Sequence, residues 1–138
     1  MPTQPIPKVS DADVERIARR DFGANLADRV ISELSRYGPT NGPERPRVRV
    51  DILRLAGGDI ERLSGGVALA IQDYRDVIVG AEMPNYPYRM KDDILAQQII
   101  DRDWRGYRAW FESTAPNQSS EPTPSAVTSP AGQESRPR

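Results

Sequence analysis

The sequence predicts an all-α protein that folds as a compact bundle of about five helices. Apolar residues recur at helical spacing in successive segments, and glycine or proline residues separate these segments. Only residues 48–52 alternate as a strand would, and a lone strand has no partner for its backbone groups. A single folded region of about 100 residues can bury one hydrophobic core without metals or disulfide bonds.

Composition divides the 138 residues into three parts. Residues 1–8 contain three prolines and no apolar run, so we expect a flexible N-terminal segment that is not a signal peptide. Residues 9–112 carry nearly all the large apolar side chains and are expected to form the helical domain. Residues 113–138 contain five prolines and one large aliphatic residue, Val127, which predicts a disordered tail.

Two short helices are predicted at the start of the domain. Ser10 is a typical N-cap residue, and Asp13 lies where a carboxylate favours the positive end of a helix. The first helix extends to Phe22, and we expect Gly23 to end it in the left-handed conformation. Apolar residues at helical spacing then continue as far as Tyr37. The prolines and glycines of the next nine residues predict a loop.

Residues 47–52 fit two kinds of secondary structure. Val48, Val50 and Ile52 alternate as in a strand, whereas Val48, Ile52 and Leu55 share one helical face. We choose the helix, since the strand requires two copies of the segment to pair in a dimer.

The longest predicted helix spans residues 60–82. Asp59 is expected to cap it, and apolar residues stay on one face for more than five turns. Gly65 and Gly66 interrupt the pattern, and each costs about 1 kcal/mol relative to alanine. Because the hydrophobic phase continues across the glycines, we interpret the segment as one kinked or closely packed helix.

The last helix is predicted to start near Lys91. Trp104, Tyr107 and Phe111 fit its buried face, whereas Trp110 lies off that line and is expected to be exposed. Aromatic residues beside arginine are typical of binding hot spots. We therefore propose a partner surface here, and a second one at the predicted helical turn after Gln72. The candidate binding residues are Trp110, Tyr107, Arg108, Asp73, Arg75 and Asp76.

The absence of histidine and cysteine excludes several kinds of site. Ser-His and Cys-His nucleophiles, structural zinc and iron–sulfur clusters all need one of these residues. Only metals bound by oxygen atoms remain. We predict no catalytic residue, no metal and no cofactor.

The net charge of the chain does not favour binding to a polyanion. The 19 basic and 20 acidic residues leave a net charge of −1, so we do not expect a nucleic-acid partner. No stretch of about 20 apolar residues is present, so we expect a cytoplasmic protein without a membrane span. Apart from Lys8 and Lys91 every basic residue is arginine, which we attribute to GC-rich codons because the arginines are interspersed with acids.

These observations favour a non-enzymatic protein-interaction or regulatory module that binds a protein partner or itself. One alternative is an enzyme in which Asp73 and Asp76 hold an oxygen-ligated divalent metal. Another is a helix-turn-helix DNA-binding protein, with residues 47–56 as its first helix. The acidic character of the second helix, residues 59–82, disfavours the DNA-binding alternative.

Three short motifs carry a resemblance to known proteins. The sequences ILRLAGGD (52–59), DYRDV (73–77) and AEMP (81–84) resemble small bacterial helical proteins of uncharacterised function. The resemblance implies an all-α fold and a bacterial, cytoplasmic origin. It implies no activity, ligand or functional residue.

Overall fold

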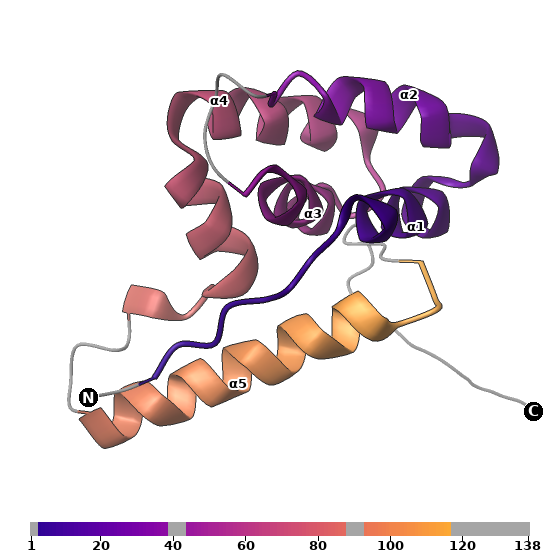
Figure 1. Cartoon of the computed structure of the whole chain (residues 1–138). Coiled ribbons are helices and arrows are strands. Elements are labelled where there is room, and N and C mark those ends of the chain that lie inside the picture. The colour runs from indigo at the N-terminus through magenta and orange to yellow at the C-terminus, as the bar shows by residue number, and fades with distance from the viewer. Residues whose placement is uncertain (1–2, 39–43, 88–92, 117–138) are drawn as a thin grey trace, which may run out of the picture.

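The computed structural model describes residues 3–38, 44–87 and 93–116. In these residues there are five helices and no strand, which confirms the predicted all-α class (Figure 1). The helices are α1 (Asp11–Phe22), α2 (Ala24–Leu34), α3 (Arg45–Ala56), α4 (Ile60–Glu82) and α5 (Asp93–Glu112). None of the described helices has the length and apolar character needed to cross a membrane.

Three predicted features extend outside the described residues. They are the middle of the loop before α3 (39–43), the predicted start of the last helix at Lys91, and the predicted tail from residue 117 onward.

Helix α3 lies at the centre of the fold, with α1, α2 and α4 around it and α5 below (Figure 1). Seven of its 12 residues are buried, including Val48, Val50 and Ile52. A helix that is covered on most sides can bury residues that lie two positions apart. The strand-like alternation of Val48, Val50 and Ile52 is therefore compatible with a helix. The helical choice is confirmed, and the strand is wrong.

Local capping matches the sequence around α1, with one exception. Ser10 Oγ accepts a hydrogen bond from the Asp13 amide at 3.3 Å, and Asp13 Oδ2 accepts one from the Ser10 amide at 3.0 Å. Gly23 has φ 85° and ψ 158°, so the predicted left-handed cap is wrong. Its extended, positive-φ backbone ends α1 and starts α2, a conformation that glycine allows. Helix α2 ends at Leu34, before the buried Tyr37.

The corner between α3 and α4 contains the predicted Asp59 cap. Gly57 takes the left-handed conformation at φ 58° and ψ 33°. Asp59 Oδ1 accepts hydrogen bonds from the amides of Glu61 at 2.8 Å and Arg62 at 3.2 Å. A Cβ atom on Gly66 would lie 3.0 Å from Cγ2 of Ile52. The glycine therefore allows close packing of α4 on α3, as the continuous hydrophobic phase indicated.

Helix α4 changes direction at Asp73, not at the glycine pair. Asp73 has φ −159° and ψ 97°, and its Oδ1 accepts a hydrogen bond from the Arg75 amide at 3.1 Å. The side chain thus caps the second half of α4 in the way that an N-cap starts a new helix. The first half runs beside α2 and the second half descends toward the start of α5 (Figure 1). The prediction that residues 72–76 form one helical turn is wrong.

The N-terminal residues lie along α5. Residues 3–9, which we name the strap, run without regular secondary structure between α5 and the other helices (Figure 1). Pro7 is buried and Val9 packs against the hydrophobic core. The predicted flexible segment 1–8 is therefore, from Thr3 onward, a packed part of the fold.

Candidate functional site

A buried group of ionisable side chains lies where α3, the end of α4 and α5 meet. We name Arg47, Asp51, Glu82 and Tyr107 the ionic cluster. Arg47 Nε lies 2.8 Å from Glu82 Oε2, and Arg47 Nη2 lies 2.6 Å from Glu82 Oε1. Arg47 is 9% exposed and Glu82 is 2% exposed. This bidentate ion pair satisfies both charges away from water.

Asp51 lies one helical turn after Arg47 and is 0% exposed. Within the described part of the chain, neither of its carboxyl oxygens has a hydrogen-bond donor at normal geometry. Burial raises the pKa of Asp51 well above its usual value, neighbouring Glu82 raises it further, and Arg47 opposes the rise. The Arg47 guanidinium is already paired with Glu82, and it offsets only part of the rise in this pKa.

Tyr107 joins α5 to the cluster. It is 1% exposed, and burial followed by the charge of Asp51 raises the pKa of its hydroxyl above the usual value. The Arg54 guanidinium lies 5.5 Å from the Tyr107 ring centroid and 5.5 Å from that of Trp110. Burial lowers the pKa of Arg54, and the two aromatic faces provide a weakly hydrated cation with electrostatic attraction.

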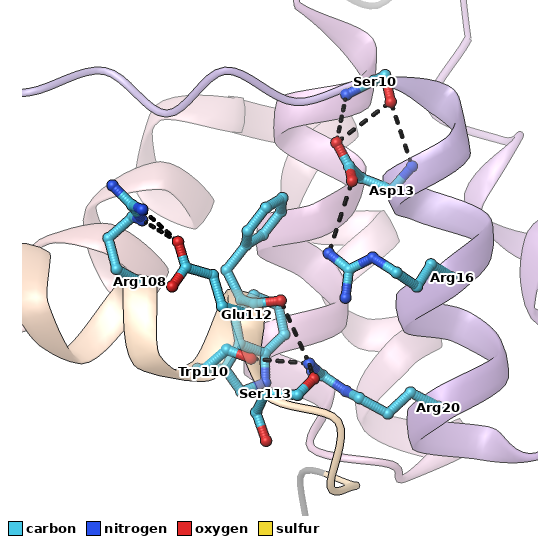
Figure 2. Close-up of polar contacts among 9 residues, drawn as sticks. Ser10, Asp13, Arg16, Arg20, Arg108, Trp110, Glu112 and Ser113 are labelled. Atoms are coloured by element: carbon cyan, nitrogen blue, oxygen red, sulfur yellow. Dashed lines mark hydrogen bonds and ion pairs between the residues drawn. The ribbon is translucent and has the colours of Figure 1, made fainter.

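Arginine also anchors the C-terminal end of α5 to α1 (Figure 2). Arg20 Nη1 donates to the carbonyl oxygens of Trp110 at 2.7 Å and Ser113 at 2.8 Å. The Arg20 side chain is 6% exposed and pairs with Asp21, while its guanidinium lies 5.0 Å from the Trp110 ring centroid. A cation at this position satisfies the free carbonyls and the negative end of the helix dipole.

These contacts limit the explanation that arginine is abundant only because of codon usage. Arg49 donates to the Tyr37 carbonyl at 2.8 and 3.2 Å, so it links the segment after α2 to α3. Together with Arg20 and Arg47, it uses the planar guanidinium to make two or more hydrogen bonds at once. Lysine cannot reproduce that geometry.

Two hollows flank the strap. The aromatic hollow, of about 360 Å³, is bounded by strap residues and by Trp104, Tyr107, Arg108, Phe111 and Glu112 of α5. The second hollow, of about 390 Å³, is bounded by the strap and by Glu44, Pro46 and Arg47. Tyr107 and Arg47 of the ionic cluster thus each line one of the two hollows.

Gln97 of α5 binds the backbone of the strap. Its Oε1 accepts from the Thr3 amide at 2.7 Å, and its Nε2 donates to the Thr3 carbonyl at 3.2 Å. Nε2 also donates to Asp101 Oδ1 at 3.0 Å, which orients the amide group. A side-chain amide that pairs with both polar groups of one residue recognises extended backbone without reading its side chain.

The structure separates the predicted partner residues on α5. Tyr107 is buried in the ionic cluster, and Arg108 is exposed and ion-paired with Glu112 (Figure 2). Trp110 is half-buried against the hydrophobic core, so the expectation that it lies off the buried face is wrong. The guanidinium groups of Arg20 and Arg54 lie 5.0 and 5.5 Å from its ring centroid, in the junction between α5 and the remaining helices. Trp104 borders the aromatic hollow.

The second predicted surface lies elsewhere, at the break in α4. Arg75 pairs with Asp73 at 2.9 Å, and its side chain is 76% exposed. Asp76 is exposed in the next turn, and the break keeps the two aspartates from forming the expected pair on one turn. Across the described residues, no three acidic side chains converge as a metal ion would require.

Sequence reasoning missed Asp51, Glu82, Gln97 and the strap. One pattern pointed to the buried charges: Arg47 and Asp51 are four residues apart and therefore lie on one face of the predicted helix, as an ion pair within a helix would. Glu82 comes from another helix, and no local pattern assigns it to this pair.

Comparison with known proteins adds no assignment. The chain matches no protein-family model, no curated protein and no solved structure.

Proposed function

We propose that this chain is a non-enzymatic protein-interaction module of a bacterial cytoplasm, and that its docking site is the groove that holds the strap. The observation that carries the proposal is the aromatic hollow beside the strap, where Trp104 and Phe111 line unfilled space next to exposed Arg108. Aromatic and arginine side chains around a concave surface are the composition of interaction hot spots.

The other two functions have less support. Asp73 caps a helix and pairs with Arg75, which leaves no converging acidic set for a divalent metal around it in the described residues. Arg47 and Arg49 bind Glu82 and the Tyr37 carbonyl, so neither guanidinium is directed at a phosphate backbone.

Selection of peptides from a displayed random library on the full chain tests the proposal. We expect peptides that bind the wild-type chain and lose at least tenfold in affinity to Arg108→Glu, which reverses a charge at the aromatic hollow. Arg105→Glu is the matched control, because Arg105 is exposed on the same helix but does not border the hollow. Failure to enrich any peptide, or equal losses in both variants, would contradict this docking site.

A further inference from the structure

The strap has the pattern of a bound peptide. Along its course, Pro7 is buried and Val9 is half-buried, whereas Ile6 is 62% exposed and Lys8 is exposed. From Ile6 to Val9, alternate residues therefore face the protein, as in a peptide that lies in a groove. Proline restricts the backbone before binding, which lowers the entropy lost when the segment is ordered.

The groove contacts this segment in two separable ways. Gln97 pairs with the amide and the carbonyl of Thr3 at 2.7 and 3.2 Å. Four residues later, Pro7 lies between the two hollows, one on the aromatic side of α5 and one beside the start of α3. The first contact recognises extended backbone and the second selects an apolar, rigid residue.

The strap does not fill its groove. Hollows of about 360 and 390 Å³ remain on its two sides, and Ile6 stays largely in solvent although it borders both. Each hollow is also lined by Lys8 and by one acidic residue, Glu112 or Glu44, and these carboxylates pair with Arg108 and Arg47. The unfilled space on both sides leaves room for a ligand that is bulkier than the strap.

We propose that the groove recognises extended, proline-containing segments of a partner protein, and that residues 3–9 occupy it as an intramolecular competitor. This inference rests on the proposed function and adds the ligand class and its regulation. A segment tethered in cis has an effective concentration in the millimolar range, so a partner must bind better than the strap or act when the strap is displaced.

The test uses the full chain and a synthetic peptide of residues 3–10 added in trans. Pro7→Glu places a charge at the buried strap position and should release the strap, whereas Ile6→Glu places the same charge at the exposed neighbouring position. Tryptophan fluorescence reports binding, because Trp104 borders the aromatic hollow and the peptide contains no tryptophan. Circular dichroism establishes that each variant is folded.

We expect a saturable fluorescence change in Pro7→Glu, with at least tenfold tighter apparent binding than in the wild type or in Ile6→Glu. A peptide with alanine in place of both prolines should bind Pro7→Glu at least tenfold more weakly. A folded Pro7→Glu chain that gives no response up to about 1 mM peptide overturns the proposal, since that concentration matches the cis competitor. Equal responses in Pro7→Glu and Ile6→Glu also overturn it.

Two further outcomes are decided by additional measurements. If Pro7→Glu fails to fold, a photoreactive residue at peptide position 6 is used with the wild-type chain at millimolar concentration. Cross-links to 104–112 then support the proposal, and cross-links elsewhere or none overturn it.

If light scattering finds a wild-type dimer that the peptide dissociates, a second copy occupies the groove and the intramolecular competitor is wrong. Library peptides that bind at Arg108 while the strap peptide does not would remove only this inference, whereas failure of both would remove the proposed function as well.

Discussion

The interior formed by α1 to α4 and the face on which α5 rests are held together by different interactions. Between the first four helices most contacts are apolar, with Ile17, Val30, Leu53 and Leu63 each 0% exposed. Below them, α5 faces the buried Arg47–Glu82 pair, which joins α3 to α4, and it is held by arginines, aromatic rings and the amide of Gln97.

The two regions differ in how specific their contacts are. Apolar packing can be made by any side chain of suitable size, whereas a buried charge needs one particular partner. Apolar packing depends mainly on area and volume, so related side chains can replace one another at moderate cost. A buried ion is stable only while its own counterion is in place. The α5 face should therefore lose more than the interior when a single charged residue is removed.

The largest effect is expected from Arg47→Met. This change leaves Glu82 without its guanidinium at 2% exposure, and we expect a loss of about 4 kcal/mol in the free energy of unfolding in urea. Arg45→Met is the matched control, because Arg45 is exposed two residues earlier. Adding Glu82→Leu to Arg47→Met should recover part of the loss, since the unpaired charge is removed. If Arg47→Met is as stable as Arg45→Met, the Arg47–Glu82 pair is exposed to solvent.

Leu53→Ala tests the apolar side of the comparison. Leu53 is 0% exposed in the central helix, so truncation leaves a cavity and should cost about 3 kcal/mol in urea unfolding. Ile71→Ala, at a residue that is 40% exposed, should change stability by less than about 0.5 kcal/mol. Equal losses at both positions would contradict the burial pattern.

Trp110→Ala should cost about 2 kcal/mol, because a half-buried ring that contacts two guanidinium groups is removed. The midpoint of urea unfolding measures the effect. An unchanged midpoint, together with lost binding of a partner, would instead support the sequence-based hypothesis that Trp110 is a free interaction residue.

Asp51→Asn is expected to have the smallest effect and one that depends on pH. The folded pKa of Asp51 is raised, so from its unfolded pKa of about 3.8 upward the folded state retains a proton that the unfolded state releases. Wild-type stability should therefore fall as pH rises through this window and level off above the folded pKa. Asparagine keeps the shape without titrating and should be more stable than the wild type at pH 8 by on the order of 1 kcal/mol.

Urea unfolding of both chains at pH 5 and pH 8 measures this difference. Asp76→Asn, at an exposed carboxylate, is the control for the loss of one negative charge. If the advantage of Asp51→Asn is the same at both pH values, Asp51 is not held neutral in the fold.

Local interactions explain which structural predictions succeeded. The Ser10 cap and the Asp59 cap involve residues at most three positions apart, so neighbouring residues in the sequence determine their geometry. The break in α4 does not follow from local spacing. Gln72 to Asp76 fit a helical turn by spacing, yet the path of the chain toward α5 uses Asp73 as a cap.

The candidate site was less accessible to sequence reasoning because its contacts join distant segments. The bond between Gln97 and Thr3 spans 94 positions, and the Arg47–Glu82 pair spans 35. The sequence identified Arg108 and the aromatic residues of α5 as a candidate surface. It assigned Trp110 to the exposed face, since helical spacing alone cannot include the arginines that α1 and α3 place near that ring.

The sequence by itself determined the all-α class and the capping residues at the start of α1 and at the α3–α4 corner. It did so because hydrophobic periodicity and capping act within a few residues of one another. Only the tertiary structure decided that Asp51 is buried beside Glu82, that arginines close helix ends, and that the strap lies along α5. These outcomes depend on the low-polarity surroundings created when remote helices meet, where a charge or an unpaired backbone group is stable only beside its partner.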